Sequence, residues 1–167
     1  MRKVLIFGNS GSGKSTLARR LSAEEGMAHL DLDVLAWLPT EPPERRPLSE
    51  SRADIDRFIA QHDSWVIEGC YTDLLELAAA ESSEMIFMNL PVAVCRENAR
   101  NRPWEPHKYD SKAAQDANLE MLIDWISHYP DRSGTFSESA HRQLFANYTG
   151  KKTLITSNPP ENSLLSR

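Results

Sequence analysis

A glycine-rich loop near the N-terminus is the feature that most constrains what this chain can fold into. Residues 4–7 (VLIF) are apolar and predict a buried strand, and residues 8–15 read GNSGSGKS. That octapeptide satisfies the pattern GxxxxGK[ST] at every fixed position. Residues 14–24 then carry apolar side chains on one helical face. The sequence therefore predicts a strand, a tight loop and a helix in direct succession.

The chemistry of this loop suits a phosphate group. Glycines tolerate positive φ, which lets successive backbone N–H groups turn inward around an anion, and the N-terminus of the following helix attracts negative charge. Lys14 can reach the β- and γ-phosphates of ATP, and the Ser15 hydroxyl can complete a Mg²⁺ coordination shell. We therefore expect the loop to bind ATP with Mg²⁺. The expected nucleotide-binding residues are Gly8, Asn9, Ser10, Gly11, Ser12, Gly13, Lys14, Ser15 and Thr16.

Two other interpretations of the loop fit less well. A plain glycine-rich turn would not explain why strand, loop and helix all fall where phosphate binding needs them. A dinucleotide-binding loop has a different glycine spacing and no use for Lys14 and Ser15.

The rest of the chain alternates strand-like and helix-like segments. Strands are expected at residues 4–7, 28–32, 65–67, 85–90 and 153–156, and helices at residues 14–24, 74–80, 94–100, 111–128 and 137–148, with a further helix capped by Ser49. Such alternation implies crossover connections and a mainly parallel sheet covered on both faces. One α/β domain over residues 1–167 is expected, with an acceptor-side segment at about 34–64 and a lid at about 101–112.

The composition narrows the class of protein. A net charge of −5 and a pI near 5.5 disfavour non-specific nucleic-acid binding, which needs a basic surface. No apolar run approaches the ~18 residues of a membrane helix, and the apolar run near the N-terminus is too short for a signal peptide. Cys70 and Cys95 form neither a CxxC pair nor a disulfide framework, so each is expected to be a small buried thiol. The expectation is a cytoplasmic protein without membrane contact.

Polar side chains gather at the carboxyl ends of the expected strands, where open parallel sheets bind ligands. Asp31 ends the second strand, and Asp33 follows in the next loop, where it can face the same site. One carboxylate could orient Mg²⁺ and the other could accept a proton from an acceptor hydroxyl. Glu68 follows the third strand and is open to two interpretations, an acid near the metal or a side chain of the acceptor pocket. Asn89 lies at the end of the fourth strand.

Arginines cluster where the fourth helix runs into an irregular stretch. Arg96 and Arg100 are four residues apart and share a helix face, and Arg102 follows in the expected lid. Such a cluster can simply complement the helix dipole, but phosphoryl transfer also needs cations and a cover that excludes water. His107 and Lys108 lie in the same stretch, and the pattern assigns them no role.

Other side chains give weaker signals. Trp37, Trp104 and Trp125 could line a pocket or pack in the core, and residues 157–159 (SNP) could approach an adenine ring through backbone groups. The histidines show no metal-ligand spacing.

Five segments together resemble a known group of proteins. They are GNSGSGKST (8–16), DLDVLAW (31–37), WVIEGCY (65–71), IFMNLP (86–91) and LIDWISHYPD (122–131). The combination resembles the adenylate-kinase-related P-loop proteins, and within them the topology modulation, or FlaR-like, group. The resemblance covers most of the chain. It implies a three-layer P-loop NTPase fold like that of nucleoside monophosphate kinases, with a parallel five-stranded sheet of order 2-3-1-4-5.

Shikimate kinases, from the same superfamily, carry a similar pair of acids after the second strand. The resemblance implies that Asp31 lies near Mg²⁺ and Asp33 near the acceptor hydroxyl. It also makes Arg102 the preferred lid arginine, because an arginine–proline pair is found in the lid of those enzymes. The chain departs from its group at residues 68–70 (EGC in place of DGN) and at Asn89, where an acid is usual.

These observations favour an ATP-dependent phosphotransferase acting on a small hydroxyl or phosphate acceptor. The expected catalytic residues are Lys14, Asp33 and Arg102; the acceptor-binding residues are Asp33, Glu68, Arg96 and Arg100; and the metal ligands are Ser15 and Asp31. The alternative is an ATP-binding regulatory or DNA-topology-related protein with weak ATPase activity. A plain ATPase would need a water-positioning residue that the sequence does not supply. Neither the acceptor nor the oligomeric state follows from the sequence.

Overall fold

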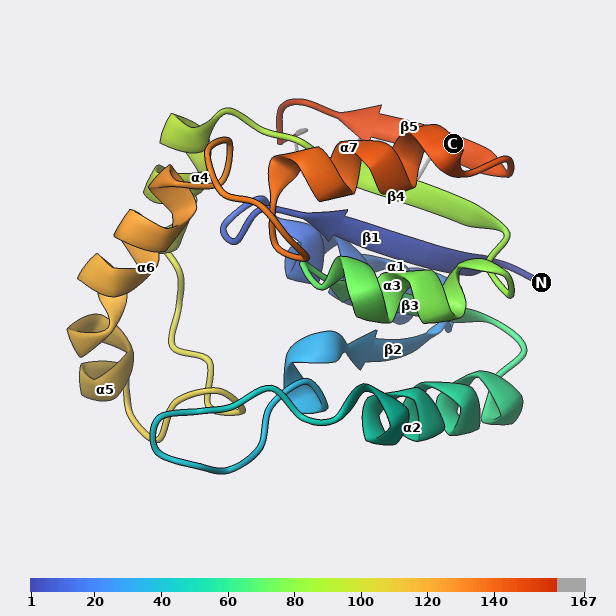
Figure 1. Ribbon diagram of the computed structural model, residues 1–167, viewed down its shortest axis with the longest axis horizontal. Coiled ribbons are helices and arrows are strands. Elements are labelled where there is room, and N and C mark those ends of the chain that lie inside the picture. The colour runs from blue at the N-terminus through green and yellow to red at the C-terminus, as the bar shows by residue number, and fades with distance from the viewer. Residues whose placement is uncertain (159–167) are drawn as a thin grey trace.

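A five-stranded parallel sheet forms the centre of the computed structural model, which describes residues 1–158 (Figure 1). Its strands are β1 (Lys3–Gly8), β2 (Ala28–Asp31), β3 (Trp65–Gly69), β4 (Glu84–Met88) and β5 (Lys151–Ile155). They lie in the order β2-β3-β1-β4-β5, and every neighbouring pair is parallel. The expected fold class and strand order are confirmed.

Helices cover both faces of the sheet. They are α1 (Lys14–Glu25), α2 (Leu48–Gln61), α3 (Thr72–Ala79), α4 (Val92–Arg100), α5 (Lys112–Ala117), α6 (Leu119–Ser127) and α7 (Glu138–Asn147). Figure 1 shows α3 and α7 in front of the sheet and α1 behind it. No helix between residues 1 and 158 is long and apolar enough to cross a bilayer.

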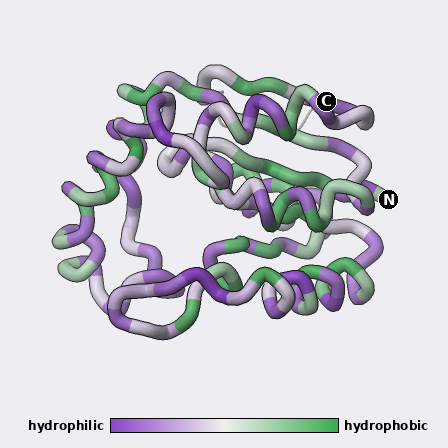
Figure 2. Tube along the Cα trace, in the orientation of Figure 1, coloured by the Kyte–Doolittle hydropathy of each residue, from purple (hydrophilic) through white to green (hydrophobic). Residues whose placement is uncertain are grey.

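The alternation of side chains along β1 explains the two cores. Leu5 and Phe7 point into a cluster that includes residues of α2, α3 and α7, whereas Val4 and Ile6 point into a cluster with residues of α1, α4 and α6. Figure 2 shows β1 as hydrophobic along most of its length. A strand buried on both faces must be apolar throughout, as the sequence of residues 4–7 predicts.

Register brings the polar strand ends together. Asp31 of β2 lies beside Glu68 of β3, and Gly69 of β3 lies beside Phe7 of β1. The loop after β1, the acids after β2 and the end of β3 therefore share one edge of the sheet.

Three local expectations are corrected. The strand predicted at 28–32 ends at Asp31, because its carboxylate accepts a hydrogen bond from the Asp33 N–H and starts a 3₁₀ turn (Leu32–Val34). Ser49 does not cap α2, which begins at Leu48 after Pro47 without a side-chain cap. The helix predicted at 111–128 is divided at Asn118 into α5 and α6.

Candidate functional site

The loop after β1 has the backbone that the glycine pattern predicts. Gly8, Gly11 and Gly13 have φ values of 154°, 77° and 95°, and α1 begins directly after Gly13. A Cβ atom at Gly8 would lie 2.3 Å from the carbonyl oxygen of Met88, and one at Gly11 would lie 2.3 Å from that of Cys95. The loop is therefore packed so closely against β4 and α4 that side chains at these glycines would clash.

Several polar groups of the loop have no acid partner, or no hydrogen-bond partner at all, among the described residues. Lys14 Nζ donates only to the carbonyl oxygen of Asn9, at 3.3 Å, among the described residues. The Ser12 hydroxyl is buried without a partner in residues 1–158. Asn9 Nδ2 donates to the Ile126 carbonyl at 3.2 Å and so ties the loop to α6. A free ammonium, an unpaired hydroxyl and a helix N-terminus fit an incoming phosphate.

Oxygen ligands for a divalent cation lie directly beside this loop. Ser15 Oγ donates to Glu68 Oε1 at 2.8 Å, and His29 Nε2 lies 3.4 Å from the same oxygen. Glu68 is 1% exposed. The described part of the chain contains no cluster of three or more His, Cys, Asp or Glu that could hold a metal alone. One hydroxyl and one carboxylate still fit Mg²⁺, which keeps water and phosphate ligands as well. Of the two interpretations of Glu68, this position favours the acid near the metal.

The two acids after β2 differ in their electrostatics. Burial, together with the negative charges of Glu68 and Asp33, raises the pKa of Asp31. Burial alone would raise the pKa of Asp33 too, but the Lys108 ammonium and a hydrogen bond from Tyr71 hold it below the usual range. Asp33 is thus the acid that stays ionised most readily.

Lys108, for which the sequence pattern predicts no role, lies between these acids. Its Nζ is 2.7 Å from Asp33 Oδ2, 3.6 Å from Asp31 Oδ2 and 3.2 Å from Glu105 Oε2. His107 Nε2 is 3.6 Å from Asp31 Oδ2. Figure 1 shows the segment between α4 and α5, in yellow, running from α4 down toward the loop after β2. This irregular stretch has no periodic pattern, so only the structure could bring it to the acids.

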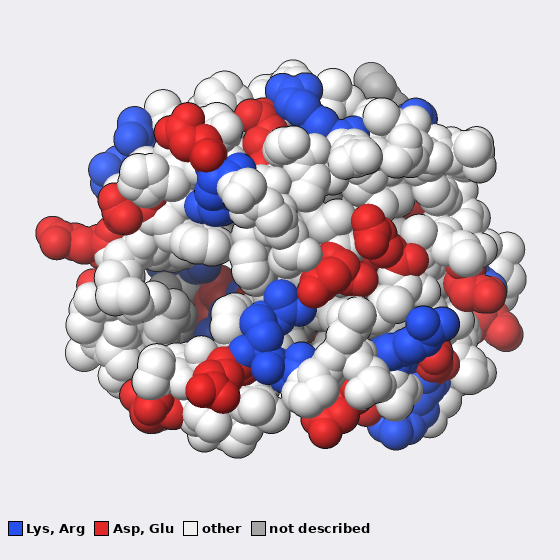
Figure 3. Space-filling model, viewed as in Figure 1, with Lys and Arg blue, Asp and Glu red and all other residues white. Residues whose placement is uncertain are grey.

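Aromatic side chains lie next to the Asp33 carboxylate oxygen that does not contact Lys108. Tyr71 Oη donates to Asp33 Oδ1 and accepts a hydrogen bond from Trp37 Nε1 at 2.8 Å. Phe136 packs against both rings, and Trp125 of α6 packs on Phe136 with centroids 5.5 Å apart. We call Trp37, Tyr71, Trp125 and Phe136 the aromatic wall. Figure 3 shows this face hollowed between α5, α6 and the loop after β2, with charged side chains in its depth.

Two arginines stack on the aromatic wall but differ in their partners. Arg45 lies 5.2 to 5.8 Å from the ring centroids of Trp37, Tyr71 and Phe136, and pairs with Asp73 at 3.1 Å. Arg132 lies 3.8 Å from the Trp125 centroid.

Arg132 has no acid partner among the described residues. Its Nε donates to the Phe136 carbonyl at 3.0 Å, and its Nη1 donates to the Trp125 carbonyl. The positive charges of Arg132 and Lys14 both act on the pKa of Cys70, just past β3. Arg132 bonds to the Trp125 carbonyl, and Asn9 of the phosphate loop bonds to the carbonyl of the next residue, Ile126, so Arg132 lies on the segment that contacts this loop.

The three arginines named from the sequence have other partners. Arg102 Nε is 3.3 Å from Glu105 Oε1, Arg100 is exposed and lies 3.4 Å from Glu97, and Arg96 donates to Ser127 Oγ at 3.3 Å. None of them is paired with Asp31, Asp33 or Glu68 in residues 1–158, and their predicted roles stay predictions.

The segment after β5 contacts the phosphate loop from outside. Asn158 Nδ2 donates to the Ser12 carbonyl at 3.0 Å, and Asn98 Nδ2 donates to both Asn158 Oδ1 and the Gly11 carbonyl. Pro159 lies outside the described residues, and an adenine contact by residues 157–159 stays a prediction.

The sequence predicts that both cysteines are small buried thiols, and Cys95 is buried whereas Cys70 is only half-buried. Burial raises the pKa values of Cys95 and Cys70 to about 11 and about 12 respectively. Neither thiol supplies a nucleophile to the site.

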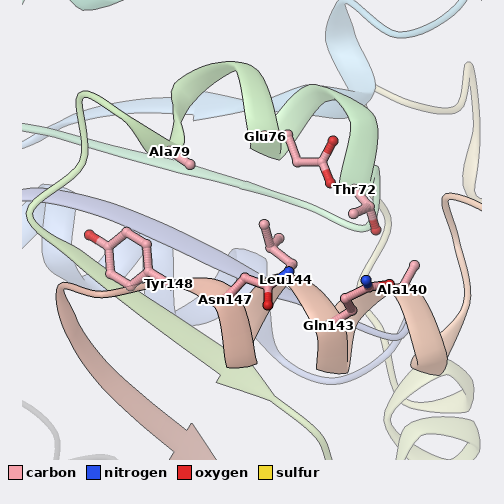
Figure 4. Close-up of a pocket in the computed structure, with 8 residues that line it drawn as sticks. All are labelled: Thr72, Glu76, Ala79, Ala140, Gln143, Leu144, Asn147 and Tyr148. Atoms are coloured by element: carbon pink, nitrogen blue, oxygen red, sulfur yellow. The ribbon is translucent and has the colours of Figure 1, made fainter.

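A separate cavity lies away from this site. It measures about 350 Å³ between α3 and α7, where Glu76, Gln143 and Asn147 line it (Figure 4). No residue of the phosphate loop and none of the acids after β2 belongs to its lining.

Comparison with known proteins agrees with this geometry. The AAA_18 family, described as an AAA domain, matches residues 4–120, which hold the phosphate loop, both acids and Lys108. The chain belongs to this family. The protein YqaC of Bacillus subtilis (strain 168), described as uncharacterized, is 24% identical over 135 residues, covering 80% of this chain and 75% of its own.

Solved structures share the fold. A sugar kinase from Janibacter sp. HTCC2649 matches with a TM-score of 0.52 and 12% identity over 96% of this chain and 87% of its own. The shikimate kinase of Acinetobacter baumannii, solved with shikimate, matches with a TM-score of 0.53 and 14% identity over 96% of this chain and 86% of its own. At such identity the likeness concerns the fold, which is that of P-loop kinases. The finer resemblance to the topology modulation group stays a prediction.

Proposed function

We propose that this protein is an ATP-dependent phosphotransferase that moves the γ-phosphoryl group of MgATP to a hydroxyl of a small acceptor. The observation that carries the proposal is an ionised carboxylate, Asp33, beside a loop built for phosphate. The Asp33 N–H donates to Asp31, which lies beside Glu68 in the sheet, and Glu68 accepts a hydrogen bond from Ser15 of the loop. The sugar and shikimate kinases that share the fold support this reading by analogy.

The donor half of the site consists of residues 8–16 and the groups beside them. Loop amides and Lys14 hold the phosphates, while Ser15 and Glu68 fit Mg²⁺, with Asp31 one strand away. Bound Mg²⁺ would supply charge neutralisation between the phosphates. We therefore propose that Glu68 lies near the metal ion and that Asp33 contacts the acceptor.

The acceptor half is organised around Asp33. Tyr71 fixes one carboxylate oxygen, and Lys108 holds the other at 2.7 Å. When an acceptor hydroxyl takes the place of Lys108, Asp33 can accept its proton as the oxygen attacks phosphorus. Lys108 is then released toward the phosphates, where a cation is useful.

A further cation must balance the charge of the transferring group. We give this role to Arg132 rather than to Arg102, because Arg102 is paired with Glu105 while Arg132 has no acid partner among the described residues. Stacking on Trp125 fixes the guanidinium plane in advance.

The proposal is tested by a screen of nucleosides, nucleotides and small hydroxyl metabolites with MgATP, measuring ADP release and phosphorylated product. We expect acceptor-dependent transfer that falls by about 100-fold or more in Asp33→Asn, since loss of a general base typically costs that much. The control is Asp56→Asn, which changes an exposed acid of α2 and should leave the rate unchanged. ADP formation that is equally fast without any acceptor would refute the proposal in favour of an ATPase or a nucleotide-regulated protein.

A further inference from the structure

We infer that the acceptor is an uncharged hydroxyl compound with an apolar ring face, such as a nucleoside or a neutral sugar, rather than a nucleotide or an acid. The inference deepens the proposed function, since it concerns the acceptor side of the same site. It rests on the way in which the charges around Asp33 are already paired.

Two arginines of the segment between β2 and α2, Arg45 and Arg46, are neutralised by acids of the protein itself. Arg45 pairs with Asp73 through both carboxylate oxygens, at 3.2 and 3.1 Å. Arg46 pairs with Asp54 at 2.6 Å. A site that binds the phosphate or carboxylate of its ligand leaves the charge of an arginine without an acid partner, whereas Arg45 and Arg46 each have one.

Arg132 is the described exception near the aromatic wall, and the phosphoryl group in transit accounts for it. That group comes from the donor and carries its own negative charge, so it needs a cation whatever the acceptor is. An anionic acceptor would have to compete for the same guanidinium.

Several carboxylates lie beside Asp33. Asp31 lies beside Glu68 in the register of β2 and β3, and Asp31 Oδ2 and Asp33 Oδ2 share Lys108 Nζ, at 3.6 and 2.7 Å. Glu105 lies in the same region, with its Oε2 3.2 Å from Lys108 Nζ. A second anion placed here would be repelled, whereas a neutral hydroxyl can donate to these carboxylates.

The aromatic wall suits the body of such a compound. Trp37 is 40% exposed and Trp125 is 39% exposed, although both take part in the packing around Phe136. The apolar face of a sugar ring or the flat face of a base can pack on an exposed indole at little entropic cost. Nucleosides and neutral sugars share this combination of a ring face and hydroxyl groups.

The test is calorimetric binding of matched pairs that differ in charge, measured with Mg²⁺ and a non-hydrolysable ATP analogue present. The pairs are adenosine with AMP, thymidine with TMP, glucose with gluconate, and ribose with ribose 5-phosphate. We expect at least one neutral member to bind about tenfold or more tightly than its anionic partner, and no anionic member to bind more tightly than its neutral one. The pair that responds tells nucleosides from sugars.

A charge variant makes the test specific. Asp73→Asn keeps the size of the side chain but frees the charge of Arg45, so the preference for the neutral member should fall by about tenfold. The control is Asp56→Asn, which changes the net charge equally by breaking the exposed pair of Arg52 and Asp56 on α2. It should leave the preference unchanged. Circular dichroism and thermal melting establish that both variants are folded.

The outcomes separate this inference from the kinase proposal. Tighter binding of any anionic member, absence of binding by every neutral member at millimolar concentration, or an unchanged preference in Asp73→Asn overturns the inference. Binding of neutral compounds without phosphorylation refutes the kinase proposal and leaves the inference standing. Phosphorylation of an anionic compound alone overturns the inference and leaves the kinase proposal standing.

Discussion

His141 should make the stability of this protein depend on pH above the range where carboxylates titrate. Its ring is buried in α7, with Nδ1 2.6 Å from Tyr129 Oη and Nε2 2.8 Å from the Cys70 carbonyl oxygen. A carbonyl only accepts, so Nε2 carries the proton and Nδ1 accepts from the tyrosine. The neutral ring therefore satisfies both partners. Burial, with help from the charges of Lys14 and Arg132, lowers the pKa of His141 to about 4.

The direction and size of this pH dependence of stability follow from the pKa values of His141 in the unfolded and folded chain. The unfolded chain binds a proton at His141 near the ordinary value of 6.5, whereas the folded chain does so only near 4. Stability is therefore complete above pH 6.5 and falls as pH decreases toward 4. At about 1.4 kcal/mol per pH unit, the difference of about 2.5 gives a loss of roughly 3 kcal/mol. That is a large part of the ~5–15 kcal/mol of a typical domain.

The measurement is urea unfolding between pH 7 and pH 4, compared between the wild type and His141→Gln. The glutamine amide can still donate to the Cys70 carbonyl but does not titrate. The wild type should lose roughly 3 kcal/mol more than the variant over this interval, because the shared contributions of the carboxylates, including the opposing one of Asp31, cancel in the difference. His128→Gln, at a side chain that is 61% exposed, is the control and should follow the wild type. A difference between wild type and His141→Gln that does not change with pH would refute the reasoning.

Two further predictions concern the groups around Asp33. Tyr71→Phe removes the hydroxyl that bridges Trp37 and Asp33, which leaves the indole N–H and the carboxylate without this partner. The free energy of unfolding in urea should fall by about 1–3 kcal/mol, and an unchanged value would show that water replaces the hydroxyl. Lys108→Ala removes the ammonium that lowers the pKa of Asp33, so the acidic limb of the pH–rate profile should move to higher pH, and a limb that stays in place would mean that Asp33 is not the base.

The donor half of the site was predictable from the sequence because its determinants are local. Nine consecutive residues, 8–16, contain the glycines, the lysine and the hydroxyl, and the strand before and helix after them are set by their own apolar patterns. The acids at the strand ends were predictable too, since parallel strands end at one edge. In a regular strand the side chains of residues 31 and 33 would be constrained by the pleat. Because a turn begins at Asp31, Asp33 lies outside the strand, and both carboxylates contact Lys108.

The acceptor half was decided by tertiary structure. Lys108 and Arg132 lie in irregular segments whose sequence gives no period, and each meets its partners only when the chain folds back across the sheet. Arg102 was preferred from a resemblance, yet an acid three residues along, Glu105, pairs with it. The pairs of Lys108 with Asp33 and of Arg45 with Asp73 join distant segments, and local sequence does not encode them.

The division of the helix at Asn118 has the same origin. Nothing in residues 111–128 breaks a helix by propensity, but the Asn118 amide donates to the Tyr109 hydroxyl at 2.9 Å, and Tyr109 belongs to the irregular segment that also carries Lys108.

The sequence by itself determined the sheet, the phosphate loop and the acids at the strand ends, because short-range patterns specify strands, helices and turns. Tertiary structure alone decided which charges are paired and which stay free, because pairing depends on burial and on contacts across the whole chain.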